Sequence, residues 1–253
     1  MGFEDFLYTV GERGEAFARS ISRAVVDIIN PHPAERPPSF TILRRFVKRE
    51  LTPHEFLSLR LQIAFLAYLV ASFICVVFRC GIIPLSGLFL LLLLYFRWIF
   101  KKYGDYFVDL EPYRFFYYVL STISFVAFLG YLIFRRVATE LYHYYLYIFA
   151  VFVVVLAFRW YFKERYGRDY TYGVVEEIKN DLARVFVHDD IAANVKPGFY
   201  WVEAVDDLRV GSIVKLLVEE RRFRSSVPVR IIEVFLEETQ SSQTSTEPKA
   251  EAE

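Results

Sequence analysis

Residues 82–100 read IIPLSGLFLLLLLYFRWIF, and seven large apolar side chains follow one another from Leu88 to Leu94. A helix over this stretch is long enough to cross a hydrocarbon core of about 30 Å, and no charged residue interrupts it before Arg97. The strands of a membrane barrel alternate apolar and polar residues, so an unbroken run of this kind excludes them. The stretch therefore predicts a transmembrane helix.

Three further segments have the same character, which makes four expected spans at residues 61–78, 82–100, 115–134 and 141–162. They explain why 55% of the chain is hydrophobic, against about 45–50% in soluble domains. Ahead of the first span, residues 52–55 (TPHE) form a capping-box pattern, which predicts that the first helix begins at Pro53. We expect a four-helix membrane domain over residues 51–169.

Positively charged residues are distributed unevenly around the expected spans. Thirteen Lys and Arg residues lie near the span ends on one side, within residues 44–60, 97–114 and 159–168, whereas the opposite side holds only Arg79, Arg135 and Arg136. Because loops rich in Lys and Arg stay in the cytoplasm, this distribution predicts a cell-membrane protein with both termini in the cytoplasm. Glu4 and Asp5 stand where a signal peptide has basic residues, so we expect no cleaved signal.

The second and fourth spans close with similar sequences, FRWIFKKYGDY at 96–106 and FRWYFKERYGRDY at 158–170. We interpret the four spans as two copies of one hairpin, related by an axis along the membrane normal. Each copy brings an Arg, a Trp and a Lys to the expected cytoplasmic interface, as candidate anchors for anionic lipids: Arg97, Trp98 and Lys101, then Arg159, Trp160 and Lys163. They act either as ordinary interfacial anchors or as a symmetric pocket for an anion.

The flanks of the membrane domain have a soluble character. Residues 1–50 hold an amphipathic helical pattern over 3–29, a proline-rich linker and a short basic helix over 41–49, all expected in the cytoplasm. Residues 170–238 predict a small all-β barrel of the OB or SH3-like kind, with strands at 173–178, 182–187, 199–205, 212–219 and 227–235. Residues 239–253 lack large apolar side chains, and we expect a disordered tail.

Barrels of this kind often bind nucleic acids, but the charges argue against that partner. Residues 170–238 carry thirteen acidic and nine basic residues, and the only basic cluster is RRFR at 221–224. Two patterns have ligand types suited to a metal, Glu140 with His143, and the run His188-Asp189-Asp190. The first lacks the second motif of a di-metal bundle, and we interpret the run as a solvated turn. We therefore expect no metal, no other cofactor and no catalytic residue.

The paired hairpins with their FRW…FK…YG…DY endings, followed by a β domain, resemble an uncharacterised archaeal family of multi-pass membrane proteins. The resemblance covers most of the chain and implies no known activity or site residue. The layout is also similar to that of NfeD-like proteins, in which membrane helices carry a C-terminal OB barrel that helps to organise membrane assemblies.

Two functions fit these features. In the first, the protein is a non-enzymatic scaffold or adaptor, and its helices anchor a cytoplasmic barrel that binds a protein partner. In the second, a homo-oligomer forms a channel or transporter in the lipid bilayer, with the barrel as its cytoplasmic gate. A lipid-modifying enzyme is a third function, for which the sequence offers no catalytic group. An exposed apolar face on the barrel favours the adaptor, whereas a water-filled path through the helices favours transport.

Overall fold

The computed structural model describes residues 31, 33–34, 52–138, 140–206, 208–221 and 224–235. The helices predicted within 3–29 and 41–49, most of the proline-rich linker and the tail predicted at 239–253 lie outside the described residues. The chain divides into two compact units, on either side of the bond between Gly167 and Arg168.

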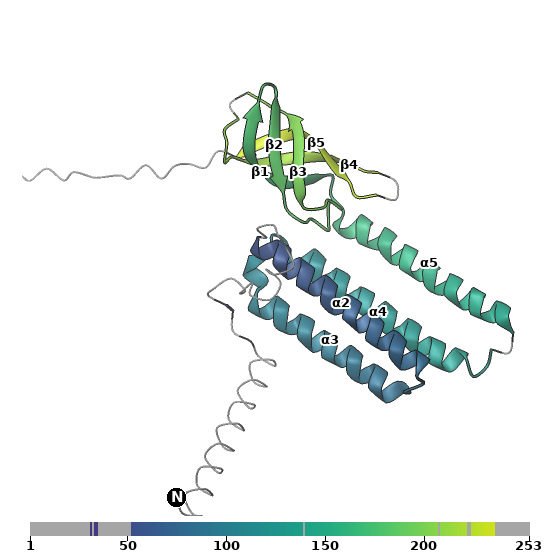
Figure 1. Ribbon diagram of the computed structural model, residues 1–253. Coiled ribbons are helices and arrows are strands. Elements are labelled where there is room, and N and C mark those ends of the chain that lie inside the picture. Colours follow the sequence, from purple (N-terminus) through teal and green to yellow (C-terminus); the bar gives the residue numbers. More distant parts are fainter. Residues whose placement is uncertain are drawn as a thin grey trace, which may run out of the picture. The chain divides into compact units, whose positions relative to one another are not determined.

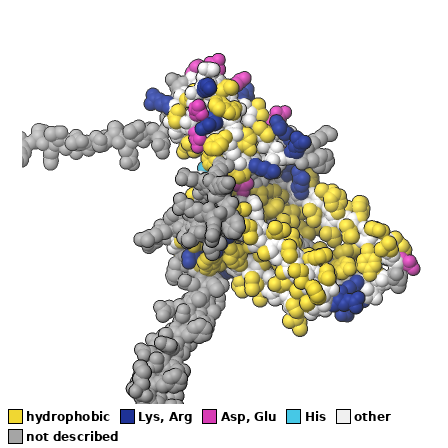
Figure 2. Space-filling view, viewed as in Figure 1, with side chains coloured by type: hydrophobic (Ala, Val, Ile, Leu, Met, Phe, Trp, Pro, Cys, Tyr) yellow, Lys and Arg dark blue, Asp and Glu magenta, His cyan; other side chains and the backbone are white. Residues whose placement is uncertain are grey.

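The first unit contains four helices that are long and apolar enough to cross a membrane: α2 (Pro53–Val77), α3 (Ile82–Lys102), α4 (Leu110–Phe134) and α5 (Leu141–Tyr166). The predicted helical membrane fold is therefore confirmed. A short 3₁₀ turn, Gly104–Tyr106, joins α3 to α4. Figure 1 shows α2, α3 and α4 packed side by side and α5 running along α4. Figure 2 shows hydrophobic side chains over much of this unit's surface, as contact with lipid requires.

The first helix starts where the capping pattern predicts. The Thr52 side chain accepts a 3.4 Å hydrogen bond from the Glu55 backbone N–H, and the Thr52 N–H donates one of 3.2 Å to the Glu55 carboxylate. Pro53 occupies the first helical position, where its missing N–H costs no helix hydrogen bond. The linker also reaches this unit at one point, since the Ala34 N–H donates to the carbonyl oxygen of Lys102 at 2.8 Å.

The second unit is a closed five-stranded barrel in the order β1-β2-β3-β5-β4. Its strands are β1 (Tyr170–Lys179), β2 (Leu182–Val187), β3 (Gly198–Glu203), β4 (Ile213–Glu219) and β5 (Val227–Phe235). Neighbouring strands are antiparallel except β3 and β5, which pair in parallel. A closed Greek-key order of five strands is of the OB kind, so the predicted small barrel is confirmed.

Alternation along the strands fills the barrel with aliphatic side chains. The fully buried members of this core include Val175, Val185, Val187, Val214 and Leu216. Gly173 lies where β1 passes closest to β2, and a Cβ there would sit 2.5 Å from Cγ1 of Val185. The β1–β2 turn is made by Asn180, whose φ of 54° lies in the left-handed region that asparagine tolerates.

Candidate functional site

The structure places the six predicted anchor residues on the last turns of α3 and α5. The exposed cations of this set are Arg97, Lys101, Arg159 and Lys163. The two tryptophans differ, since Trp160 is 68% exposed whereas Trp98 is half-buried. The role of these residues as lipid anchors stays a prediction.

Trp98 lies between two cations that the sequence pattern did not single out. Cζ of Arg60 is 5.4 Å from the ring centroid of Trp98, and Nζ of Lys102 is 5.1 Å from it. Nε of Arg60 also donates a 2.7 Å hydrogen bond to the hydroxyl of Tyr95, whose ring stacks on Trp98. Lys102 follows Trp98 by one helical turn and could have been found from that spacing. Arg60 belongs to α2, so only the tertiary packing brings it here.

The last turn of α5 uses a different cation. Cζ of Arg165 lies 5.7 Å from the ring centroid of Phe115 on α4 and 5.4 Å from that of Tyr166. Cation–aromatic contacts therefore join α3 to α2 and α5 to α4. The proposed duplication of one hairpin stays a prediction, because these contacts do not repeat from one hairpin to the next.

The barrel presents an aromatic surface on the outer side of β2 and β3. Alternation along the strands turns Arg184 and Phe186 outward on β2, and Phe199 and Trp201 outward on β3. The strand register sets Phe186 opposite Phe199 and Arg184 opposite Trp201. The rings of Phe186 and Phe199 have their centroids 5.2 Å apart. We call these four residues the β2–β3 face.

Arg184 holds the β2–β3 face together without leaving a free positive charge. Its Cζ lies 5.2 Å from the ring centroid of Phe199, and its nitrogens form ion pairs of 3.4 Å with Glu176 and 3.2 Å with Glu177. Phe199 and Trp201 stay 48% and 49% exposed. Aromatic residues and arginine are both enriched at protein–protein interfaces. The alternation could be predicted within each strand, but the contacts of Arg184 depend on the register between β2 and its two neighbours, β1 and β3.

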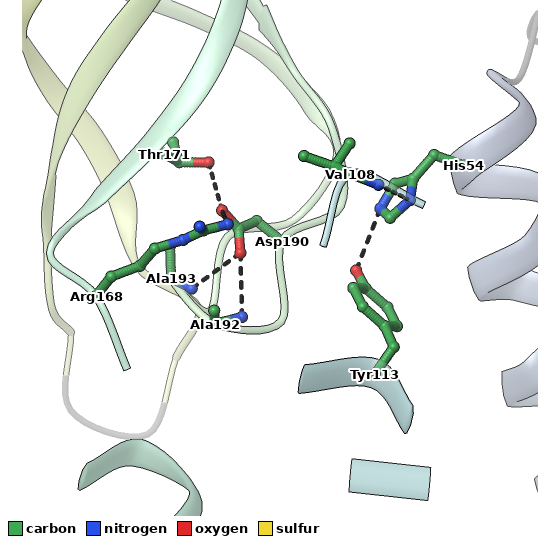
Figure 3. Close-up of polar contacts among 8 residues, drawn as sticks. All are labelled: His54, Val108, Tyr113, Arg168, Thr171, Asp190, Ala192 and Ala193. Carbon is green, nitrogen blue, oxygen red and sulfur yellow. Dashed lines mark hydrogen bonds and ion pairs between the residues drawn. The ribbon is translucent and has the colours of Figure 1, made fainter. Parts of the chain in front are cut away.

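Asp190 is buried, so the interpretation of residues 188–190 as a solvated turn is wrong for this residue. Figure 3 shows its carboxylate surrounded by donors. Oδ1 accepts 3.0 Å hydrogen bonds from the N–H groups of Ala192 and Ala193, while Oδ2 accepts from the Thr171 hydroxyl at 2.8 Å and from Arg168 at 3.0 Å. Two of these partners come from the start of the barrel, about 20 residues earlier in the chain, where local sequence reasoning cannot find them.

Burial also changes the environment of Tyr200 on the inner side of β3. Its hydroxyl donates a 2.9 Å hydrogen bond to the carbonyl oxygen of Lys196, and burial raises the pKa of the phenol above its ordinary value. The shift favours the neutral hydroxyl, which is the form that donates this hydrogen bond.

The described histidines have structural contacts. His54 is buried at the start of α2, where Nδ1 accepts a 3.4 Å hydrogen bond from the Val108 N–H and Nε2 lies 3.3 Å from the Tyr113 hydroxyl (Figure 3). Both ring nitrogens are thus used to join α2 to α4 and the loop before it. His143 stacks on Tyr142 at the start of α5. Within the described residues, no group of three His, Cys, Asp or Glu side chains is placed to hold a metal ion.

Comparison with known proteins places this architecture in a family. The sequence matches a protein-family model described as "Predicted membrane protein (DUF2101)" over residues 25–232, which is most of the chain. No curated protein matches, and no solved structure matches. The archaeal source and the similarity to NfeD-like proteins stay predictions.

Proposed function

The chain belongs to the DUF2101 family of predicted membrane proteins, and we propose that it is a membrane-anchored adaptor whose barrel binds a protein partner. Its four apolar helices provide the anchor. The observation that carries the adaptor role is the β2–β3 face, where two half-exposed aromatic side chains lie beside a stacked arginine. This proposed role is non-enzymatic, because it requires the barrel only to bind a protein partner.

The charges around the β2–β3 face define the partner that fits it. Glu176 and Glu177 on β1 pair with Arg184 of this face, and the exposed Glu203 follows Trp201 by two residues on β3. A complementary surface would insert an apolar side chain between Phe199 and Trp201 and place basic residues around it. Tryptophan and arginine are the residues that most often contribute strongly to such interfaces.

The same charges disfavour a single-stranded nucleic acid at this face. Base stacking on exposed aromatic side chains is effective when a basic groove follows the phosphate backbone. Here the only cation of the face, Arg184, is already paired with Glu176 and Glu177. A phosphate approaching Phe199 or Trp201 would therefore meet carboxylates.

Site-specific crosslinking in native membranes tests this proposal. A photoreactive phenylalanine analogue at Phe199 should crosslink to a defined protein, and the same analogue at the exposed Ile232 on β5 provides the control. Adding Trp201→Ala should weaken the interaction about thirtyfold, as loss of a hot-spot residue does. Equal crosslinking from Ile232, or crosslinking that Trp201→Ala leaves intact, would contradict the proposal.

We also propose that both termini face the cytoplasm, which puts the turn between α2 and α3 on the outer side. Cys80 is exposed in this turn, and Cys75 lies half-buried in α2. A membrane-impermeant maleimide added to intact cells should therefore label the protein, and Cys80→Ser should remove the label. If the label is incorporated only after the cells are broken, the turn lies in the cytoplasm and the proposed orientation is wrong.

A further inference from the structure

A groove of about 610 Å³ opens at the end of the helical unit where α2 and α4 finish and α5 begins. Its walls come from the last turns of α2, the second half of α4 and the first half of α5, with Phe73, Tyr131 and Val151 as one representative from each. Arg79 and Arg135, the residues that follow or cap α2 and α4, also line it. The volume lies within the usual range of ligand sites, about 300–1,000 Å³.

Aromatic contacts between α4 and α5 hold the side chain of Tyr147 in place, so that it does not fill the part of the groove next to α2. The ring of Tyr147 stacks on Phe134 with centroids 5.1 Å apart, and its hydroxyl donates a hydrogen bond to the carbonyl oxygen of Ala127. Gly130 makes room for this arrangement, because a Cβ there would lie 2.9 Å from the Tyr147 hydroxyl. Tyr147 is therefore held against α4 and leaves the space between α2 and α5 to another occupant.

The groove has the depth of one bilayer leaflet. Ala127 and Arg135 mark its extent along α4, and eight residues of helix rise about 12 Å. One leaflet contributes about half of a hydrocarbon core of roughly 30 Å. If the apolar walls of the groove lie among the acyl chains, Arg79 and Arg135 therefore lie at the depth of the lipid headgroups.

Among the described residues, the net charge at this end of the helices is positive, because Arg79, Arg135 and Arg136 outnumber Glu140, the N-cap residue of α5. Within the described residues, neither Arg79 nor Arg135 forms an ion pair with an acidic side chain, and the neighbouring Arg136 is exposed. Figure 2 shows Lys and Arg side chains at this end of the helices, beside hydrophobic surface. Guanidinium groups at the mouth of an apolar groove complement a phosphate attached to a hydrocarbon chain.

We propose that this groove binds one anionic phospholipid, with an acyl chain between α2 and α5 and its phosphate between Arg79 and Arg135. The surrounding bilayer supplies such a molecule directly, and no soluble ligand is required. The site lies at the opposite end of the helices from the candidate anchors Arg97, Lys101, Arg159 and Lys163, and it is independent of the adaptor role of the barrel.

Lipid retention by the full-length purified protein tests this site. The protein is transferred from equal amounts of phosphatidylglycerol and phosphatidylcholine into detergent, and native mass spectrometry counts the lipids that stay bound. The wild type should keep one phosphatidylglycerol in preference to phosphatidylcholine. Arg79→Gln and Arg135→Gln should each lower this preference about tenfold, which corresponds to the loss of one charge-assisted hydrogen bond.

Two further variants separate the groove from general surface charge. Arg136→Gln removes the same charge one residue away from a lining arginine and should keep the bound lipid. Val151→Phe fills the groove without changing its charge and should release it. Equal loss in Arg136→Gln, retention in Val151→Phe, displacement by inorganic phosphate alone, or a dimer in place of the lipid adduct would each overturn the proposal.

Discussion

The barrel and the helical unit bury polar groups in different ways. In the barrel, Asp190 is buried and each of its carboxylate oxygens accepts two hydrogen bonds. In the helical unit, Ser121 is fully buried in α4, and its hydroxyl has no hydrogen-bond partner among the described residues. Polar contacts of fixed geometry therefore order this part of the barrel, whereas the middle of α4 uses a small polar side chain for close packing. We expect loss of a buried polar group to destabilise the barrel more than the helices.

The largest expected effect is that of Asp190→Ala. This change removes the acceptor of four hydrogen bonds and should lower the local unfolding free energy of the barrel by about 3 kcal/mol or more. Hydrogen exchange of the full-length protein in detergent, followed by mass spectrometry, reports the barrel and the helices separately. Asp190→Asn keeps one acceptor oxygen and should cost less. Equal protection of the barrel in both variants would contradict this account.

Gly173→Ala should also affect only the barrel. The new Cβ would lie 2.5 Å from Cγ1 of Val185 and 2.9 Å from the carbonyl oxygen of Phe186, so overpacking should cost about 1–3 kcal/mol. Gly87→Ala is the matched change in α3, where a Cβ meets nothing within 4 Å. Hydrogen exchange should therefore show faster opening of β1 and β2 in the first variant and unchanged protection of α3 in the second.

A smaller effect is expected where the helical unit does use a polar contact. Tyr113→Phe removes the hydroxyl that lies 3.3 Å from Nε2 of His54 and should cost about 1 kcal/mol. Faster exchange should be confined to the first turns of α2 and α4, which this contact joins. Faster exchange over the whole of both helices would show instead that the contact stabilises the entire bundle.

The smallest effect is expected for Ser121→Ala. Because the hydroxyl has no partner among the described residues, its loss should change the stability of α4 by no more than about 0.5 kcal/mol. Ser121→Leu changes the size of the same side chain and should cost about 1–3 kcal/mol through overpacking. A large loss of stability in Ser121→Ala would contradict this comparison, because it would show that a buried polar group also stabilises the helical unit.

Features that depend on neighbouring residues were predicted from the sequence. The capping box at Thr52 and Glu55 involves residues three apart, so its pattern predicts both hydrogen bonds. The turn at Asn180 falls between the strands predicted at 173–178 and 182–187 and is equally local. The long apolar runs predicted the helices, because a chain in lipid must satisfy its own backbone hydrogen bonds.

The candidate sites could be predicted only in part. Periodicity identified the cations on α3 and α5, but Trp98 is contacted by Arg60 from another helix. The run of residues 188–190 was recognised, but two of the hydrogen bonds to Asp190 come from Thr171 and Arg168, which the pairing of β1 with β2 brings close. In both cases the missing partner is separated by too many residues for spacing to indicate it.

The sequence by itself determined that four helices can span a bilayer and that five alternating segments form a small barrel, because hydrophobic burial and backbone hydrogen bonding follow local periodicity. Only the tertiary structure decided which side chains meet. Strand pairing brought Arg184 over Phe199 and two of the donors to Asp190, and packing α5 along α4 produced the groove lined by Arg79 and Arg135. Most of these contacts join residues of different elements, and packing of whole elements sets their distances.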